Sequence, residues 1–536
     1  MTTWGLRETA PELRQRYFAE GHWDDRTLGD FAAERLALDG TLPFCVRSQE
    51  RPWEGTFAQL DAAARSLATS LAARGVGPGD VLVMQLPNWA EAGITFFAAT
   101  YLGAVIVPVV HFYGAKEVSY ILEVTNPDVV VTTDAFGRSA FLDMHAELLA
   151  QRGATWLVVR QTDQPLPPHA TDFASLLDAA PMTAPLAADP DAPALIGFTS
   201  GTTRNPKGVV HSHRTIGFEA RQLHLMSPPD QPPQITAAPV GHFIGMLNAF
   251  LIGMLRRQPV TLVDLWDPAN VLRLMREENL TMGGGATLFL TSLLDHPDFS
   301  DEHLALMPFA GLGGSAVPVA VMQRAAKLGI TAWRSYGSTE HPSITGCTIE
   351  SPEDKRITTD GDVMPGVEIR LDEQGQILSR GPDLCIGYTD PELTAKAFDA
   401  DGWYHTGDVG SLDEQGYLTI VDRIADVIIR GGENISAVEV EDLVMGLPSI
   451  AEVAVVATPD ERLGEKAAAV VRLRDGGSAP TLPELRAHLE AQGLARQKWP
   501  ESIHVVVEFP RTPSGKVQKF KVREQLRAGE LPKVES

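Results

Sequence analysis

Cysteine, basic charge and long apolar runs are all scarce in this chain of 536 residues. Its three cysteines, Cys45, Cys347 and Cys385, lie far apart, which suggests neither a disulfide framework nor a zinc site and favours a reducing cytoplasm. The formal net charge of −24 leaves no broad basic surface, so a general nucleic-acid binder is disfavoured. The N-terminal stretch MTTWGLRETAPELRQ is charged and lacks the apolar core of a signal peptide.

One uncharged run does occur, AGITFFAATYLGAVIVPVV at residues 92–110. A membrane span is one interpretation of a run of this length. We prefer a different interpretation, because Gly103 and Pro108 divide the run into a helix, a turn and a buried strand. Basic flanks are also lacking. The sequence therefore predicts no membrane span.

The chain is too long for a single hydrophobic core, so two or more domains are expected. Most of it alternates short β-rich runs with helical patterns. Residues 58–75 and 89–103 are typical of helices that end at glycine. The predicted buried strands between them are residues 80–88, 103–110 and 127–133. This alternation predicts an α/β fold in which parallel sheets are covered by helices.

The C-terminal part has a different pattern. Its predicted strands are residues 451–460, 466–474 and 503–510. Between the last two, Thr481 and Glu484 have the spacing of a capping box at the start of a helix that extends to residue 493. We therefore expect a large N-terminal domain of residues 1–422 and a small α+β domain of residues 423–536.

Charge is distributed unevenly between these two expected domains. From Arg423 onward the chain holds 16 Lys and Arg against 17 Asp and Glu, whereas the rest holds 29 against 52. The C-terminal part is thus nearly neutral and the rest strongly acidic. A polyanionic ligand would meet basic groups more easily in the C-terminal part.

The stretch TSGTTRNPKG, residues 199–208, gathers small donors and cations in one place. The hydroxyls belong to Thr199, Ser200, Thr202 and Thr203. The flexible glycines are Gly201 and Gly208, and the cation is Lys207. Together they predict a phosphate-binding cradle between a strand at 194–200 and a helix at 212–224. A polar surface turn is the alternative. The spacing of glycine, lysine and Ser/Thr differs from that of a Walker A loop.

This stretch resembles the phosphate loop of the adenylate-forming superfamily, which contains acyl-CoA synthetases, the adenylation domains of peptide synthetases and beetle luciferases. Further motifs match in the same order: YGSTE at 336–340, HTGD at 405–408, DR at 422–423 with IIRGGEN at 428–434, and PRTPSGK at 510–516. The resemblance covers nearly the whole chain, and five ordered motifs are far more specific than any one of them. It implies that the small C-terminal domain is mobile.

The resemblance also implies chemistry in two steps. A carboxylate attacks the α-phosphate of Mg-ATP to give an acyl-adenylate and pyrophosphate, and a thiol, usually that of CoA, then displaces AMP. The small domain turns between the steps. The implied cofactors are therefore ATP or an acyl-AMP, Mg²⁺ and CoA.

Site residues follow from the resemblance, motif by motif. Lys516 is expected to stabilise charge on the α-phosphate, Thr339 to bond this phosphate, and Glu340 to hold Mg²⁺. Asp408 is expected to accept the ribose hydroxyls, with Arg423 reaching the ribose. The adenine pocket is expected to involve Tyr336, Gly337, Gly313, Ser315 and Ala316, and the pantetheine channel to pass Gly431 and Gly432.

The sequence indicates the acyl substrate less clearly than it indicates the nucleotide. Peptide-synthetase domains that activate amino acids carry an aspartate in the segment that matches residues 239–247, which here contains no carboxylate. Because an unpaired buried ammonium would be costly, we expect an apolar acid. The glycines at 283–285, Gly313 and Gly337 suggest space for a long or bulky acid. His242 or Phe243 is a candidate gate of the thiol channel, and plain packing is the alternative for both.

Two positions depart from the superfamily pattern. Arg204 replaces the glycine usual at the tip of the phosphate loop, where its guanidinium could grip the β- and γ-phosphates, occupy their site or pair with an acid. If Arg204 occupies the phosphate site or pairs with an acid, the reaction with ATP would be weakened. A ligand that carries only AMP would be unaffected. Ala425 replaces the usual Lys or Asp at the hinge, and we expect it to alter the balance between the two domain orientations.

The sequence thus predicts an AMP-forming acyl-CoA synthetase that acts on an apolar, long-chain or bulky alicyclic, carboxylic acid in the cytoplasm. The alternatives are an enzyme for the thioester step alone, a ligase that loads a carrier-protein thiol, an oxygenase of luciferase type, and a non-catalytic acyl-nucleotide-binding protein. A serine hydrolase is disfavoured because no GxSxG elbow is evident. The expected partners are small molecules, and homodimerisation is left open.

Overall fold

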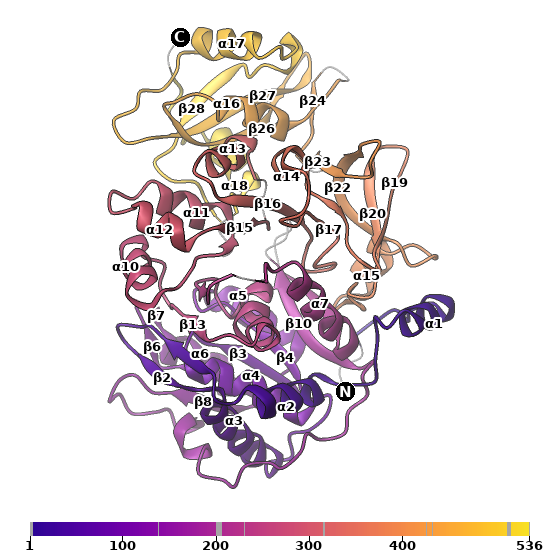
Figure 1. Cartoon of the computed structure of the whole chain (residues 1–536), viewed down its shortest axis with the longest axis vertical. Helices are drawn as coiled ribbons and strands as arrows, with labels where there is room; N and C mark the ends of the chain where they lie inside the picture. The colour runs from indigo at the N-terminus through magenta and orange to yellow at the C-terminus, as the bar shows by residue number, and fades with distance from the viewer. Residues whose placement is uncertain are drawn as a thin grey trace.

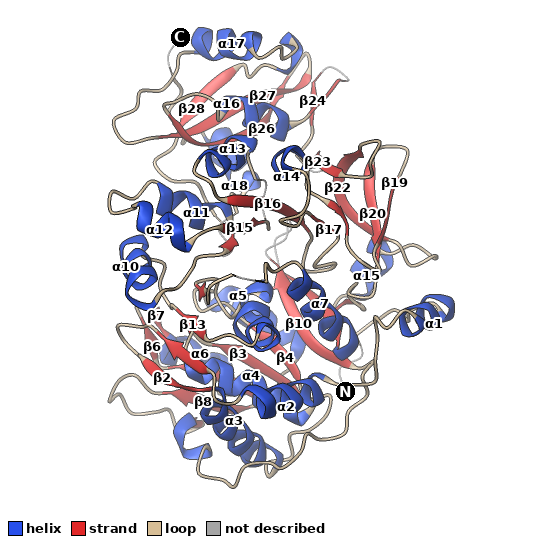
Figure 2. Ribbon diagram, viewed as in Figure 1, coloured by secondary structure: helices blue, strands red, loops and turns tan. Residues whose placement is uncertain are grey.

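The computed structural model describes residues 4–137, 139–199, 206–229, 231–314, 317–424, 426–430, 433–511 and 516–534, with the main chain alone at 433 and 434. Figure 1 shows three regions: a large helix-covered body that contains the N-terminal half, a sheet of later strands at its side, and a small C-terminal module at the far end of the long axis. The mixture of helices and strands in each layer is evident in Figure 2. The predicted α/β class is therefore confirmed.

An eight-stranded sheet is the centre of the large body. Its strands in spatial order are β21 (Gly387–Tyr388), β11 (Lys207–Ser212), β10 (Pro193–Thr199), β4 (Val105–Pro108), β3 (Val81–Gln85), β5 (Val129–Thr133), β8 (Thr155–Val159) and β9 (Ala170–Asp172). The pairs from β10 to β9 are parallel, whereas β11 is antiparallel to both of its neighbours. The predicted parallel sheet is thus confirmed for six strands, with the antiparallel strands β11 and β21 added at one edge.

The uncharged run at 92–110 folds as a helix, a turn and a strand. Helix α4 (Ala90–Leu102) ends at Gly103, whose φ of 64° is left-handed, and β4 follows with every residue buried. Helix α3 (Phe57–Ala72) packs alongside α4. Within the described residues, no helix combines the length and apolar character that crossing a bilayer requires.

Three smaller sheets complete the large body and its side. The first contains β12 (Ile235–Thr236), β13 (Val260–Leu262), β1 (Pro43–Val46) and β2 (Trp53–Thr56); the second β14 (Gly284–Gly285), β15 (Phe309–Leu312), β16 (Thr331–Tyr336), β17 (Thr345–Gly346) and β18 (Asp362–Val363); the third β19 (Glu368–Leu371), β20 (Gln376–Arg380), β22 (Tyr404–Leu412) and β23 (Leu418–Arg423). A short hairpin pairs β6 (Ala135–Phe136) with β7 (Ser139–Ala140).

Other helices cover these sheets. They are α1 (Pro11–Ala19), α2 (Leu28–Asp39), α5 (Ala115–Thr125), α6 (Phe141–Leu149), η1 (Phe173–Leu176), α7 (His213–Leu225), α8 (Phe243–Met246), η2 (Leu247–Ile252), α9 (Gly253–Arg256), α10 (Pro268–Glu278), α11 (Thr287–Leu294), α12 (Asp301–Leu306), α13 (Val319–Lys327), α14 (Glu353–Thr358) and α15 (Pro391–Ala397). The segments α8, η2 and α9 follow one another without a break.

The C-terminal module has a sheet and a core of its own. Its elements are β24 (Ile428–Arg430), β25 (Glu433–Ile435), α16 (Ala437–Val444), β26 (Ile450–Asp460), β27 (Gly464–Leu473), α17 (Leu482–Ala491), η3 (Arg496–Lys498), β28 (Ser502–Val505) and α18 (Lys519–Ala528). The capping box at Thr481 is present as predicted. The strand predicted at 503–510 is too long, because Val506 and Phe509 turn into a second apolar cluster while Val507 is 95% exposed. The domain boundary at residue 422 stays a prediction.

Candidate functional site

The predicted phosphate loop joins two paired strands. Thr199, the last residue of β10, is the partner of Lys207, the first residue of β11. The predicted helix after the loop is confirmed as α7, capped by Ser212. However, β11 lies between the loop and α7, so the helix does not follow the loop directly as we expected. The apolar residues of β11 were too few to be recognised as a strand before a capped helix.

Ten of the sequence-predicted site residues lie outside the described residues. They are Ser200, Gly201, Thr202, Thr203, Arg204, Ser315, Ala316, Ala425, Gly431 and Gly432. Their predicted roles stay predictions. The described ones are considered below.

A tight turn carries Thr339 and Glu340. It begins where β16 ends at Tyr336, and it is closed by the Ser338 amide, which donates to the His341 carbonyl at 2.9 Å. A Cβ on Gly337 would overlap the carbonyl oxygen of Pro342, so this position has room only for glycine. The turn therefore presents Thr339 and Glu340 just beyond the end of β16.

His211 fixes the position of Thr339. Its Nε2 donates to the Thr339 carbonyl at 2.7 Å, and burial lowers the pKa of His211 to about 4. The imidazole is therefore neutral at neutral pH and carries its proton on Nε2. The side chain of Thr339 lies over Gly197 of β10, where a Cβ would come within 2.9 Å of it. Sequence analysis missed His211, since nothing in its local pattern links it to a turn 128 residues later.

The carboxylate of Glu340 is buried and has one oxygen engaged. The Tyr388 hydroxyl donates to its Oε1 at 2.8 Å, and burial followed by the negative charge of Glu340 raises the pKa of Tyr388. This leaves Oε2 as the oxygen suited to Mg²⁺, a cation that prefers oxygen ligands and keeps several waters. No group of three or more His, Cys, Asp or Glu side chains stands ready to bind a metal in the part of the chain that the structure describes. Glu340 thus fits an ion held mainly by phosphates and water.

Asp408 joins Tyr336 to Arg423. The Tyr336 hydroxyl donates to Oδ2 at 2.6 Å, and the Arg423 Nε lies 2.9 Å from Oδ1. Asp408 and Arg423 are also partners in the β22–β23 ladder. Burial and the charge of Asp408 raise the pKa of Tyr336, so its hydroxyl stays a donor. A carboxylate has about four lone-pair sites, so Asp408 can still accept further hydroxyls.

Lys516 of the C-terminal module lies close enough to this group for its charge to interact with those of Arg423, Asp408 and Glu340. Burial and the positive charge of Arg423 lower its pKa to about 8, against the opposing effect of Asp408 and Glu340. Burial and the charge of Lys516 lower the pKa of His242 to about 4. The structure therefore brings Lys516, Glu340 and Asp408 together with Tyr336, Thr339, Arg423 and His242, which come from five separate stretches of the chain.

Acyl-adenylate formation is expected to weaken as the pH rises above about 8, because Lys516 then loses its charge. The measurement is kcat/KM for acid-dependent ATP–pyrophosphate exchange, over about two pH units on either side of that value. Lys516→Arg keeps its charge at these pH values, so the alkaline fall should disappear even if the rate is lower. The exposed control Lys498→Arg should keep the wild-type profile. A wild-type fall in Lys516→Arg would contradict the assignment.

Glycines near the site permit close packing rather than leaving space. A Cβ on Gly313 would meet Ser335 Oγ at 2.7 Å, and one on Gly284 would overlap the backbone of Gly311. Gly283 faces two glutamine amides in the same way. The prediction that these positions, and Gly337, leave room for a bulky acid was therefore wrong. Contacts between distant segments fill that room, and the sequence does not show them.

Phe243 packs in the core at the start of α8. It is 6% exposed and its ring centroid lies 5.1 Å from that of His211. It also lies near Gly197, so it is part of the wall beside Thr339. These contacts are those of a packed side chain. A gating role for His242 or Phe243 stays a prediction.

A buried network behind the turn was not foreseen either. Asp383 accepts the Ser343 amide at 3.2 Å and lies 3.2 Å from His341 Nε2, and Glu219 of α7 accepts the Ser343 hydroxyl at 2.9 Å. Glu219, Asp383 and His341 are all fully buried. Burial, with the neighbouring Asp383, raises the pKa of Glu219 well above its usual range, which favours its protonated form. The network fixes the chain that follows Glu340.

Glu219→Gln is expected to remove a loss of stability at high pH. A carboxyl whose folded pKa is raised contributes stability below its unfolded pKa and loses it as the pH rises. Glutamine keeps a donor there, so thermal unfolding of the variant should match wild type near pH 5 and occur about 2 °C or more higher near pH 8. Asp383→Asn is the comparison and should destabilise at both pH values, because it weakens acceptance from the Ser343 amide. Equal pH dependence of Glu219→Gln and wild type would contradict the protonated state.

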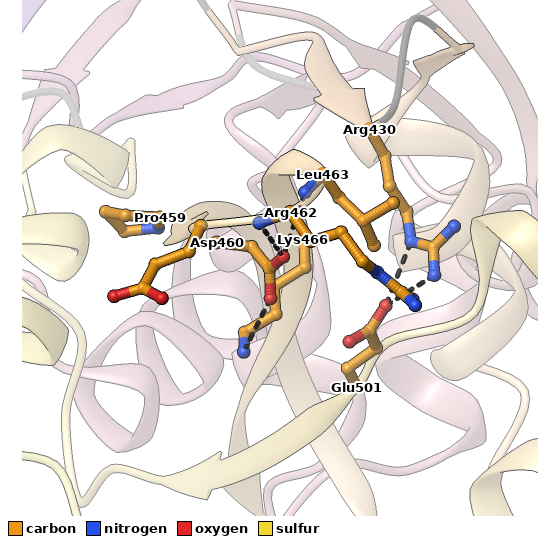
Figure 3. A pocket seen from close by; sticks show the side chains of 8 residues that line it. Arg430, Pro459, Asp460, Arg462, Leu463, Lys466 and Glu501 are labelled. Carbon is orange, nitrogen blue, oxygen red and sulfur yellow. Dashed lines mark hydrogen bonds and ion pairs between the residues drawn. The ribbon is translucent and has the colours of Figure 1, made fainter.

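An open cavity of about 520 Å³ lies apart from this group, on the C-terminal module (Figure 3). Arg430 Nε and Nη2 donate to Glu501 Oε1 at 2.9 and 2.7 Å. Asp460 accepts the Arg462 and Leu463 amides at the β26–β27 turn. Arg430 and Lys466 of the cavity therefore each face a carboxylate, and none of the sequence-predicted site residues lines it.

The candidate site thus combines a turn with a carboxylate and a threonine, a buried carboxylate tied to a tyrosine, and a lysine from a separate module. In comparison with family models, residues 43–389 match the AMP-binding enzyme model and residues 439–516 match the AMP-binding enzyme C-terminal domain, so the chain belongs to the AMP-binding enzyme family. Within this family it is an AMP-forming acid–thiol ligase of the acyl-CoA synthetase type.

Individual relatives are similar over nearly their full length. The chain is 32% identical to a medium-chain fatty-acid–CoA ligase of Escherichia coli (strain K12), over 96% of this chain and 93% of the relative. It is 35% identical to the 3-[(3aS,4S,7aS)-7a-methyl-1,5-dioxo-octahydro-1H-inden-4-yl]propanoyl:CoA ligase of Rhodococcus jostii (strain RHA1), over 88% and 93%. The crystal structure of ATP-bound MatB from Rhodopseudomonas palustris superimposes with a TM-score of 0.83 at 27% identity, over 93% of this chain and 99% of that chain.

Proposed function

We propose that this ligase activates an apolar carboxylic acid as its acyl-adenylate and transfers the acyl group to CoA. The observation that carries the proposal is the meeting of Lys516 with Asp408 and Glu340, which places a buried cation from the small module beside two carboxylates of the large body. This is the charge arrangement that attack on an α-phosphate requires. ATP and CoA as substrates follow from the family.

The chain's own residues divide the work of the first step. Lys516 offsets the negative charge that develops on the α-phosphate, and the Thr339 hydroxyl donates to the same group. Asp408, oriented by the Tyr336 hydroxyl and Arg423, accepts hydrogen bonds from the ribose. Glu340 would hold Mg²⁺, and the ion would supply further positive charge to the phosphates. The neutral His242 adds no charge near the acyl carboxylate.

The acid is proposed to be medium- or long-chain, or alicyclic. Support comes from the names of relatives, which are ligases for a medium-chain fatty acid, a long-chain fatty acid and a dioxo-octahydroindenyl propanoate. The described part of residues 239–247 offers no carboxylate for an ammonium, so an amino acid is disfavoured.

The two steps can be tested separately over a panel of fatty, alicyclic, aromatic and polycyclic acids. The first assay is acid-dependent ATP–pyrophosphate exchange, and the second is thioester formation from a preformed acyl-adenylate with CoA. Exchange together with thioester for the same acid is the expected result. Thioester without exchange would contradict full ligase activity and favour the alternative, motivated by Arg204, that the adenylate comes from another enzyme. Replacing CoA by a holo-carrier protein tests the alternative in which a carrier-protein thiol accepts the acyl group.

A further inference from the structure

A polar cluster that is partly buried lies beyond the residues used above. It consists of Arg256, Ser227, Gln231, Gln234 and Thr281, and we refer to it as the Arg256 cluster. Arg256 is the last residue of α9, and the others come from the segment after α7 and the segment before β14. None of them belongs to the nucleotide motifs.

The guanidinium of Arg256 has only neutral partners in the described chain. Its Nη1 donates to Gln234 Oε1 at 2.6 Å and its Nε donates to Ser227 Oγ at 2.9 Å. Burial lowers its pKa to about 10, so it is still charged at neutral pH. No carboxylate of the described residues forms an ion pair with it. Buried charges are normally paired, because an unpaired charge in a poorly solvated place is costly. The Arg256 guanidinium therefore lacks an anionic acceptor among the described residues.

Two further polar atoms of the cluster lack hydrogen-bond partners among the described residues. They are Nε2 of Gln231, a residue that is 5% exposed, and Oγ1 of Thr281, which is fully buried. Nε2 of Gln231 and Nε2 of Gln234 both point to the place where Gly283 lacks a side chain, since a Cβ there would overlap both. Buried polar groups are nearly always satisfied, so the unmet atoms beside the half-buried Arg256 guanidinium indicate a missing acceptor oxygen.

The cluster lies one strand away from the candidate site. The Gly283 carbonyl accepts the Gly311 amide at 3.1 Å, and the Gly285 carbonyl accepts the Gly313 amide at 3.2 Å, so β14 runs from the cluster toward the site. Met226, next to Ser227, packs in the same apolar cluster as Tyr336.

A second route joins the two places. The continuous helical segment from Phe243 to Arg256 begins beside Thr339 and ends in the cluster, a span of about 20 Å. An acid whose carboxylate is at the site and whose far end is at Arg256 is therefore elongated. The buried apolar residues of this segment, Phe243, Met246, Leu247, Phe250, Leu251 and Met254, belong to the main hydrophobic core.

We propose that the Arg256 cluster recognises an acceptor oxygen, a ketone or a second carboxylate, at the distal end of an otherwise apolar acid. The inference rests on the proposed function, since it takes the acyl carboxylate to react beside Lys516. Arg256 acts as a specificity determinant. Gln231 and Gln234 supply the further donors, and Gly283 leaves their amides free to approach.

The test compares acids of equal length that differ only at the far end. Hexadecanoic acid, the methyl-ketone acid of the same length and hexadecanedioic acid are assayed for thioester formation, together with the corresponding tetradecanoic and octadecanoic sets. Wild type is expected to prefer one oxygenated class over the plain acid by about tenfold to a hundredfold in kcat/KM, the usual effect of a hydrogen bond to a charged group. The ketone and dicarboxylate arms distinguish the two sources of the oxygen.

The variants separate recognition from folding. Arg256→Met should abolish the preference and leave kcat/KM for the plain acid within about threefold, and Arg256→Lys should restore part of the preference. Gln231→Leu should reduce the preference without removing the cation. The control is Arg276→Met, at an exposed position on α10. No preference in wild type, or an equal loss for all acids in Arg256→Met with unchanged thermal unfolding, would overturn the inference.

Failure of the proposed function has a different signature. If no acid gives a thioester, we measure binding of the same acids instead. The measure is the rise in thermal unfolding temperature that each acid causes. A greater rise with oxygenated acids in wild type, absent in Arg256→Met, would support the cluster even though the ligase proposal had failed. Equal rises for plain and oxygenated acids would overturn the cluster as well.

Discussion

Lys516→Ala is expected to lower the rate of acyl-adenylate formation by about 10²–10³-fold, the usual effect of removing one fixed group that stabilises transition-state charge. Lys516 is the cation that the small module brings to Asp408 and Glu340, and its burial makes its charge effective. ATP–pyrophosphate exchange at saturating acid measures this step.

The second half-reaction provides the internal comparison for this variant. Thioester formation from a preformed adenylate should change by less than about fivefold, because no charge then develops on an attacked α-phosphate. Lys498→Ala, which removes an exposed lysine of the same module, should leave both steps unchanged. Equal losses in both steps, or no loss in the first, would remove Lys516 from the proposed role.

Gly337→Ala is expected to lower acyl-adenylate formation by about 10²-fold, because its Cβ would overlap the Pro342 carbonyl and lie 3.0 Å from that of His341. The turn must open to relieve this overlap, and Thr339 and Glu340 move with it. Such overpacking typically also costs ~1–3 kcal/mol of stability. Exchange kinetics and thermal unfolding are measured on the same preparation.

The matched control for this substitution is Gly77→Ala. A Cβ on Gly77 would meet nothing within 4 Å, and its backbone is not left-handed. This variant should keep wild-type exchange rates and unfolding temperature. Wild-type exchange in Gly337→Ala would show that the turn tolerates the overlap and that its geometry is less important than we infer.

Features encoded by neighbouring residues could be predicted from the sequence. The helix that ends at Gly103, the capping box at Thr481 and the buried strand at 129–133 all depend on local spacing, and the structure has them. The resemblance to the adenylate-forming superfamily also implied that Lys516, Glu340 and Asp408 serve one nucleotide, and the structure brings the three close together although they lie far apart in the chain.

Contacts set by topology could not be predicted in this way. Tyr388 reaches Glu340 from 48 residues away and His211 reaches Thr339 from 128 away, and neither belongs to a periodic pattern. The glycines at 283–285 illustrate the same limit. A sequence shows that a side chain is missing, but only the fold shows whether a neighbour fills the place, as Gly311 does at Gly284.

The pairing of Asp408 with Arg423 separates the site into two parts. One part stays with the large body, and the other part would move with the small module. Both residues belong to one β ladder, so their ion pair does not depend on the orientation of the chain that follows Arg423. Tyr336 is anchored to the same carboxylate and stays with it. Lys516, by contrast, comes from beyond β28 on the small module. A turn of that module would withdraw one positive charge while the ribose contacts persist, so the AMP group could remain held while the chemistry at its phosphate changes.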